Sequence, residues 1–253
     1  MVAAANLTWQ EFADRVERVV ILPVGSFEQH GPHLPLGTDS VIATKLAERV
    51  GKELDALVLP TLAYGYRSAP YSGGGSTFPG TLDLRLNTLT VLIQDILTEL
   101  VADGCTKVLI LNAHYENTAA IMEAMYLVGE RFPSQVSLVT TAWWDCVDAE
   151  VLSDVFDDGP FPGWELEHAA LTETSLMMHL DPESVHEDAL PGDEGFHAPN
   201  YIRIPLKPGD IPAHGGLASA RGASAAKGQR IADAAVDGVA QLCRKEWGLD
   251  VGH

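Results

Sequence analysis

The sequence predicts an α/β fold of three layers, in which helices cover both faces of a mainly parallel sheet. Short apolar runs alternate with longer segments of helical periodicity, which is typical of βαβ units. The chain has 253 residues, enough for one sizeable core and short for two. No internal repeat or low-complexity linker divides it, so we expect residues 1–253 to form a single domain.

Four short apolar runs are the expected strands. They are Val19–Val24, Ala56–Leu59, Lys107–Leu111 and Val136–Trp143. Each is too short for a helix and is followed by a segment rich in turn formers or polar residues, as a buried strand would be. Pro60 closes the second run, because proline cannot donate a backbone hydrogen bond to a sheet.

Four longer segments are the expected helices. They are Asp39–Val50, Asn87–Val101, Glu116–Phe132 and Ala223–Trp247. In these segments apolar residues recur at intervals of three or four, and Asp103-Gly104 supplies an end to the second.

Two loop-rich stretches break this alternation: the first is Ser68–Gly80, and the second comprises Gly159–Gly163 and then Pro182–Gly216. Long loops in a compact domain are often functional. The first contains Gly73-Gly74-Gly75, which would let backbone approach a ligand closely; a flexible surface turn is the alternative.

The chain is strongly acidic, with a net charge of −19 from 35 acidic and 16 basic side chains. Such a field repels polyanions, so we expect no nucleic-acid partner. Adaptation to high salt, where self-repulsion is screened, and an ordinary solvated acidic surface are both open explanations.

Targeting and redox signals are absent from the sequence. No apolar run approaches the ~18 residues of a membrane helix, and the first residues lack the basic patch and apolar stretch of a secretory signal. We therefore expect a cytoplasmic protein with no membrane partner. Cys105, Cys146 and Cys243 are far apart and form no CxxC motif, so buried free thiols are expected.

The first polar cluster follows the first expected strand. Glu28 and His30 are two residues apart, and in extended backbone such residues point to the same side. In open α/β sheets, sites form beyond the carboxyl ends of strands, and this pair stands at such an end. Asp39 follows at an expected helix start, where it could equally be an N-cap.

A second cluster repeats this pattern after the third strand, where His114 and Glu116 are again two residues apart. Together the two clusters offer two imidazoles and three carboxylates. Mixed nitrogen and oxygen ligands suit zinc or manganese, and a bridging carboxylate can hold two ions. A metal site is therefore predicted at the carboxyl edge of the sheet.

A third segment carries Trp164, Glu165, Glu167 and His168. His168 could be a further ligand, a general acid or base, or a salt-bridged surface residue. Trp164 beside a glycine suits a mobile aromatic lid, with a core tryptophan as the alternative, and the same two possibilities hold for Trp144.

These motifs resemble the creatininase family of creatinine amidohydrolases over most of the chain. The family motifs are Leu22-Pro23-Val24-Gly25, Glu28-Gln29-His30-Gly31, Phe78-Pro79-Gly80-Thr81 and Asn112-Ala113-His114-Tyr115-Glu116-Asn117. Narrower creatininase-like features are Tyr64-Gly65-Tyr66, Ser72-Gly73-Gly74-Gly75, Trp144-Asp145 and Gly163-Trp164-Glu165-Leu166-Glu167-His168. The resemblance implies a creatininase-like three-layer α/β/α fold and a homohexamer.

The resemblance also implies two divalent metal ions per subunit, with zinc and manganese expected. Glu28, Asp39 and His114 would hold one ion, and His30, Asp39 and Glu116 the other. The substrate contacts carried over are Ser72, Tyr115, Trp164, Glu165 and His168, and Trp144 is expected to form another apolar wall.

The activity implied is hydrolysis of a cyclic amide, creatinine to creatine, with a metal-bridging hydroxide as nucleophile. The catalytic residues implied are His168, as general acid, and Glu116. Alternatives are a two-metal hydrolase acting on a hydantoin-like ring, a formamidopyrimidine or a peptide, and a scaffold without turnover. Four positions depart from the creatininase pattern. Ala113 and Ala169 replace glycines, Thr77 replaces a histidine and Glu165 replaces an aspartate. These changes leave the expected metal ligands intact and fall at positions that bear on the choice of substrate.

Overall fold

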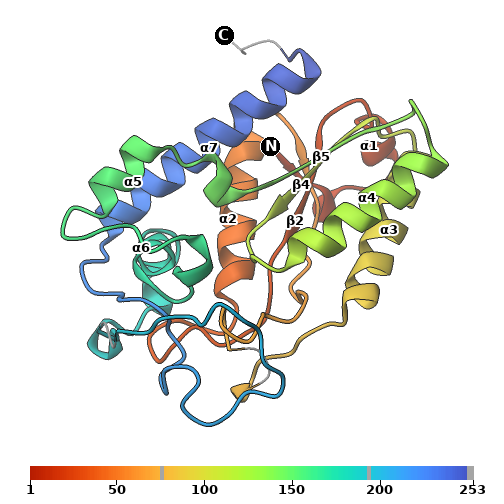
Figure 1. Cartoon of the computed structure of the whole chain (residues 1–253). Helices are drawn as coiled ribbons and strands as arrows, with labels where there is room; N and C mark the ends of the chain where they lie inside the picture. The colour runs from red at the N-terminus through yellow and green to blue at the C-terminus, as the bar shows by residue number, and fades with distance from the viewer. Residues whose placement is uncertain (75–76, 193–194, 250–253) are drawn as a thin grey trace.

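The computed structural model describes residues 1–74, 77–192 and 195–249, and within them the sheet has five parallel strands. The strands are β1 (Val2–Ala3), β2 (Val20–Val24), β3 (Leu57–Val58), β4 (Lys107–Asn112) and β5 (Ser137–Ala142). Their order across the sheet is β1-β3-β2-β4-β5 (Figure 1). β2 pairs with β4 along its whole length, from Val20 opposite Val108 to Val24 opposite Asn112.

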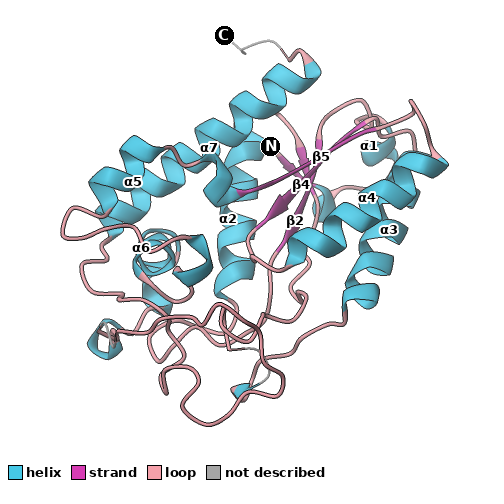
Figure 2. Ribbon diagram, viewed as in Figure 1, coloured by secondary structure: helices cyan, strands magenta, loops and turns pink. Residues whose placement is uncertain are grey.

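Helices cover both faces of the sheet, as Figure 2 shows. One face carries α2 (Thr38–Glu53), α6 (Leu171–Leu180) and α7 (Ala225–Trp247), with α5 (Ala149–Val155) packed on α7. The other face carries α3 (Leu86–Ala102) and α4 (Asn117–Arg131), with α1 (Trp9–Ala13) nearby. The apolar core divides accordingly, with Ile21 and Leu109 in one cluster and Leu22 and Ile110 in the other. The predicted three-layer fold is confirmed.

All eight predicted elements are present, with ends that shift by at most three residues. The fourth expected strand, Val136–Trp143, ends at Ala142, because Trp143–Cys146 turns into a short 3-10 helix. The sequence reading missed β1, α1, α5 and α6. His168, considered as a possible helix start, lies in a turn three residues before α6.

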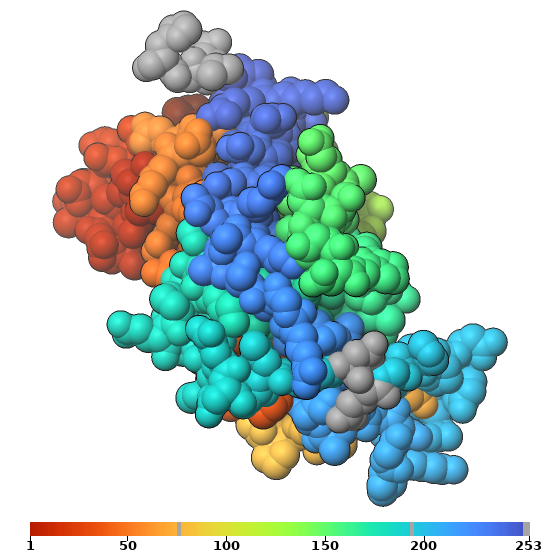
Figure 3. Space-filling view, turned by 90° about the vertical axis from the view of Figure 1, so that its left-hand side faces the viewer, coloured from red at the N-terminus to blue at the C-terminus, as the bar shows by residue number. Residues whose placement is uncertain are grey.

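Residues 195–215 form loops at one end of the molecule, and Figure 3 shows them protruding beyond the face that α7 crosses. Within the described residues, no helix is long and apolar enough to cross a lipid bilayer. The three cysteines are free thiols; Cys105 and Cys243 are buried and Cys146 is half-buried.

Candidate metal centre and cavity

Two neighbouring strands deliver the first site residues. β2 runs into the turn that holds Glu28 and His30, and β4 runs into His114 and Glu116. Asn117 fixes the two strand ends to each other: its Nδ2 donates to the Gly25 carbonyl at 3.0 Å. The polar pairs therefore lie together at the carboxyl edge of the sheet, as the sequence predicts.

Asp39 enters from the first turn of α2. The N-cap of this helix is Gly37, so Asp39 is not the cap that the sequence left as an alternative. Its carboxylate is almost fully buried and faces the histidines. Gly25 allows this approach, because a Cβ there would lie 2.7 Å from the Ser40 backbone and 2.8 Å from the Asp39 carbonyl carbon.

Glu28, Asp39 and His114 form the first potential metal-binding group. His114 Nδ1 lies 3.1 Å from both Glu28 Oε1 and Asp39 Oδ2. Ser68 Oγ donates to the other oxygen of Glu28, which orients the carboxylate. These three residues are the ones expected for one ion.

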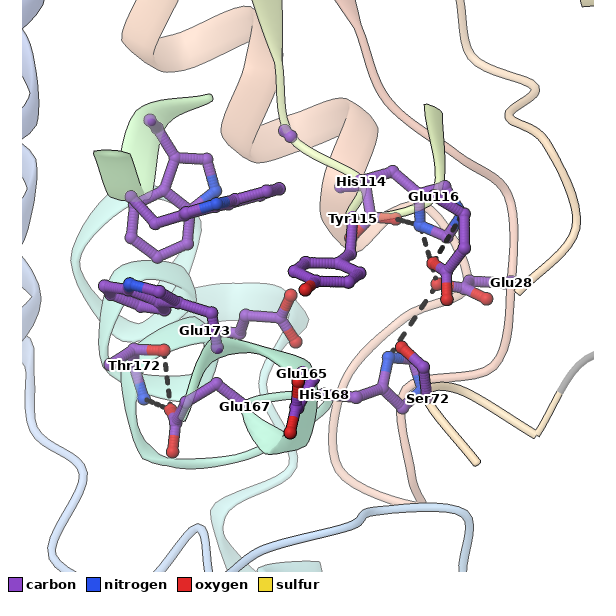
Figure 4. Close-up of a pocket in the computed structure, with 15 residues that line it drawn as sticks. Glu28, Ser72, His114, Tyr115, Glu116, Glu165, Glu167, His168, Thr172 and Glu173 are labelled. Atoms are coloured by element: carbon purple, nitrogen blue, oxygen red, sulfur yellow. Dashed lines mark hydrogen bonds and ion pairs between the residues drawn. The ribbon is translucent and has the colours of Figure 1, made fainter. Parts of the chain in front are cut away.

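His30, Asp39 and Glu173 form the second group. His30 Nε2 lies 2.9 Å from Asp39 Oδ1 and 3.6 Å from Glu173 Oε2. The resemblance implied Glu116 as the third ligand, but the structure places Glu173 beside His30 and Asp39. In Figure 4 the Glu173 carboxylate points from α6 across the cavity toward His114 and Glu28.

Glu116 is turned elsewhere. It directly precedes α4, and its Oε1 accepts a hydrogen bond from the Ala69 backbone N–H at 2.9 Å. Its Oε2 lies 3.4 Å from His114 Nε2, the nitrogen directed away from Asp39. Burial raises the pKa of Glu116 despite the nearby imidazole of His114.

The donor set fits divalent metal ions. His30 Nδ1 lies 3.1 Å from the Glu28 carbonyl and His114 Nε2 2.8 Å from the Tyr66 carbonyl. A carbonyl can only accept, so each ring carries its proton there and turns a lone pair toward carboxylates. His30 Nε2 and Asp39 Oδ2 are buried without a hydrogen-bond partner. Lone pairs and carboxylate oxygens about 3 Å apart repel each other unless a proton or a metal cation lies between them.

The electrostatics of the cluster agree with this. Burial opposes a charge on His30, yet the carboxylates of Asp39 and Glu173 raise its pKa to about 10. Burial raises the pKa of Glu173 to about 8, with the His30 charge opposing. A field that holds protons so firmly would also attract a divalent cation, which displaces those protons on binding.

A small cavity opens on these groups. Every substrate contact expected from the sequence lines it, as do most of the metal-ligand candidates: Ser72, Tyr115, Trp144, Trp164, Glu165, His168, Glu28, Asp39, His114 and Glu116. Aromatic rings form one wall; Tyr115 stacks on Trp144 with centroids 6.1 Å apart, and Trp144 lies 6.4 Å from Trp164. Figure 4 shows Tyr115 between this wall and Glu116.

His168 stands at the floor of the cavity, and its ring centroid lies 4.5 Å from that of His30. Its Nε2 lies 2.8 Å from Gln29 Nε2, and its Nδ1 lies 3.7 Å from Glu28 Oε1. Burial, then the charge of His30, lower the pKa of His168 to about 4. The roles predicted for His168 and Glu116 stay predictions.

Three further residues shape the site and received no role from the sequence. In the sequence, Glu173 is only one more acidic residue near the third cluster. A signal for it does exist, because Glu173, like Asp39, is a carboxylate in the first turn of a helix. Gln29 and Ser68 act through contacts 44 and 40 residues away in sequence, which no local pattern reveals. Gly75 of the glycine run lies outside the described residues.

Comparison with known proteins agrees with this arrangement. The family model described as "Creatininase: Creatinine amidohydrolase" matches residues 5–243. The creatinine amidohydrolase of Pseudomonas putida is 38% identical over 97% of each chain. A mycofactocin precursor peptide peptidase of Mycobacterium tuberculosis is 31% identical over 86% of this chain and 81% of its own. A solved structure named "Creatininase Mn" superposes with a TM-score of 0.95 and 38% identity, over 98% of this chain and 99% of that one.

The fold, the polar clusters at the strand ends and these matches over nearly the whole length agree, and the chain belongs to the creatininase family.

Proposed function

We propose that this protein is a metal-dependent amidohydrolase that opens a small cyclic amide, with creatinine as substrate and creatine as product. One observation carries the proposal: two ligand groups that share Asp39 face a cavity with an aromatic wall. Two divalent ions fit the groups Glu28–Asp39–His114 and His30–Asp39–Glu173. Relatives with solved structures, one named "Creatininase Mn" and one a mutant creatininase of "Zn-Zn type", make manganese and zinc the metals to test first.

When bound, such ions lower the pKa of water so that hydroxide forms near neutral pH, and they polarise a carbonyl oxygen. The chain itself holds the substrate. Tyr115, Trp144 and Trp164 form an aromatic wall against which a flat ring can stack and from which water is excluded. Ser72 and Glu165 line the same cavity and can hydrogen-bond the polar edge of the ring.

Two groups outside these two ligand sets are placed to handle protons, and one of them, His168, also belongs to a third potential metal-binding group with Glu28 and His30. Glu116 lies beside His114, on the cavity wall, where a carboxylate can take a proton from the attacking water and return it to the departing nitrogen. His168 is the general acid expected from the sequence. A His168→Ala enzyme that keeps both metals and full activity would remove His168 from the mechanism.

The direct test is incubation of metal-loaded protein with creatinine while creatine formation is followed. We expect turnover that a chelator abolishes and that added Mn²⁺ or Zn²⁺ restores. No turnover with two metals bound per chain would refute the creatinine assignment. A chelator-resistant activity would refute metal dependence.

A peptide substrate is the second candidate, and one feature favours it. An open groove of about 900 Å³ shares Ser72, Tyr115, Glu116 and Glu165 with the cavity. It offers room for a chain longer than one ring, and a relative is named a mycofactocin precursor peptide peptidase. Cleavage of synthetic peptides by the metal-loaded protein, with creatinine left intact, would establish this alternative.

We also propose the homohexamer that the resemblance implies. Tyr126, Tyr201 and Ile202 are 63%, 56% and 69% exposed and line that groove together. Large exposed apolar side chains gathered in one place are typical of protein contacts. Light scattering that gives the mass of one chain, 27.2 kDa, would exclude the assembly.

A further inference from the structure

Gln29 links three separate loops through its buried side chain, which is 6% exposed as a residue. Its Oε1 accepts a hydrogen bond from the Gly31 backbone N–H at 2.9 Å. Its Nε2 donates to the Gly73 carbonyl at 2.8 Å and to the Gly215 carbonyl at 3.0 Å. The same nitrogen lies 2.8 Å from His168 Nε2.

These partners determine which way the amide of Gln29 points. Exchanging its oxygen and nitrogen would set an oxygen against the carbonyls of Gly73 and Gly215, and an NH₂ group against the N–H of Gly31. Carbonyl oxygens cannot donate and backbone N–H groups cannot accept, so only the observed orientation satisfies all three.

The group beside His168 Nε2 is therefore an N–H donor that cannot accept. His168 Nε2 must be the acceptor, and the single proton of the neutral ring then lies on Nδ1. The two hydrogens of Gln29 Nε2 serve three acceptors, so one hydrogen is shared, as in other three-centre bonds. Of the described contacts, this is the only hydrogen bond to the His168 ring.

The other ring nitrogen faces the candidate metal centre. His168 Nδ1 lies 3.7 Å from Glu28 Oε1, and the ring packs against His30. An N–H on that side presents a donor to anything bound between the ligand groups and the aromatic wall.

We infer that Gln29 is a positioning residue that fixes His168 as the Nδ1–H tautomer, so that a hydrogen-bond donor faces the reacting centre. Only the expected effect on turnover rests on the proposed function; the tautomer itself follows from the hydrogen bonds of Gln29. In that reaction His168 stabilises the negative charge that develops on the substrate and keeps its own proton. The proton for the departing nitrogen then comes from Glu116, which refines the role that the sequence predicts for His168.

The test compares two variants of Gln29 with a matched control. Gln29→Met keeps the length of the side chain and removes the donor, and Gln29→Glu replaces the donor with an acceptor, which draws the His168 proton to Nε2. Thr81→Val is the control, because Thr81 Oγ1 accepts a hydrogen bond from the Gln29 backbone N–H, at 3.1 Å, and contacts no polar atom of the Gln29 amide among the described hydrogen bonds. Each protein is assayed for bound metal, thermal unfolding, kcat and KM.

We expect both Gln29 variants to retain two metals and to lose roughly 100-fold in kcat with KM changed by no more than about threefold, since one donor to a developing charge is removed. Thr81→Val should stay within about threefold of the parent in both constants, because the amide remains in place. A metal-loaded Gln29→Met enzyme with the parent's kcat would overturn the inference, and so would loss of kcat only through loss of metal.

The tautomer is read independently of turnover from ¹⁵N–¹H long-range correlations of histidine-labelled protein, with His168 assigned by its absence in His168→Gln. The expected pattern is Nδ1–H in the parent and Nε2–H in Gln29→Glu. Nε2–H in the parent would overturn the inference even if creatinine is hydrolysed. If creatinine is not turned over, the proposed function fails, and the spectrum still decides the tautomer.

Discussion

At the scale of single residues, the chemistry of the candidate metal centre depends on what lies behind each imidazole. Backbone carbonyls of Glu28 and Tyr66 hold the far nitrogens of His30 and His114. This anchoring fixes both tautomers and keeps the rings in place, as outer contacts do in other metal sites. The affinity for metal should therefore depend on these two backbone carbonyls as well as on the ligand side chains.

Substitution of Glu173 and of Glu116 should have opposite effects on metal content, although both carboxylates line the same cavity. Glu173→Gln should reduce bound metal from two ions to one per chain, because its oxygen lies beside His30 and Asp39. Glu116→Gln should keep both ions and lose activity by about 100-fold or more, because a proton carrier is removed. Elemental analysis after exhaustive dialysis, together with kcat, separates the two roles. The reverse result would restore Glu116 as a ligand.

A buried acid next to the cavity predicts a pH dependence of stability. Glu167 Oε2 accepts hydrogen bonds from the Thr172 N–H and Oγ1 at 2.8 and 2.6 Å, while burial raises the pKa of Glu167 from 4.5 to about 7. The folded state therefore favours the protonated acid. Its contribution is complete below pH 4.5 and is lost as pH rises through 7, to a limit of about 3 kcal/mol.

Glu167→Gln keeps the acceptor for Thr172 and removes this ionisation. The fall in unfolding free energy between about pH 5 and about pH 8 should be smaller in the variant than in the parent, as measured by urea unfolding at equal metal content and protein concentration. Equal pH dependence in both proteins would contradict a raised pKa for Glu167.

The residue types of the site were predictable where they follow strands. Glu28, His30, Asp39 and His114 were predicted to lie together because strand ends and helix starts leave local signals, and the structure brings the four side chains together. Glu173 was not, since its place depends on how α6 docks on α2, a helix far from it in sequence.

At the scale of elements, the start of α2 can pack closely against Gly25 because this residue has no side chain. Gly25→Ala places a methyl group 2.7 Å from the Ser40 backbone, which cannot yield without moving the start of α2 and with it Asp39. We expect a loss of about 1–3 kcal/mol in stability and weaker binding of both metals. Chemical unfolding and metal titration measure the two effects.

Gly37→Ala is the matched control, in the same region and with the same added methyl group. No atom lies within 4 Å of the added Cβ, and the backbone φ of −95° suits any residue. Its metal affinity should equal that of the parent. If both variants lose metal alike, close packing at Gly25 is not the cause.

The elements that the sequence missed have physical reasons in common. β1 is two residues long and α1 five, so neither has room for a periodic pattern. α6 is buried nearly all round, including Thr172, Thr174 and Ser175, and therefore shows no apolar stripe. The longer helices α3 and α7 each bury one side, and the sequence located them within two residues.

At the scale of the whole molecule, the net charge of −19 acts on stability through self-repulsion. Exposed ion pairs such as Arg230–Asp154 and Lys227–Asp157 engage only a few of the 35 acidic residues. We expect the midpoint of urea unfolding to rise as KCl increases from about 0.05 to about 0.5 M and then to level off as screening is complete.

A midpoint that levels off indicates screening of charge. Preferential exclusion of salt from the protein surface would instead make the midpoint keep rising at higher salt concentration. A midpoint that does not change with KCl would favour the ordinary solvated acidic surface. A continued rise to molar salt would favour salt adaptation.

The second ligand group joins distant parts of the chain: His30 comes from the turn after β2, Asp39 from the first turn of α2, and Glu173 from α6. A bound ion would act there as a cross-link, in addition to packing and to the hydrogen bond of 2.8 Å between His33 Nε2 and Thr174 Oγ1. Amide hydrogens in the first turns of α6 should then exchange with deuterium faster after chelation, while those of β2 and β4 keep their protection. Metal loss would in this way become visible to proteases and quality-control systems before the fold is lost.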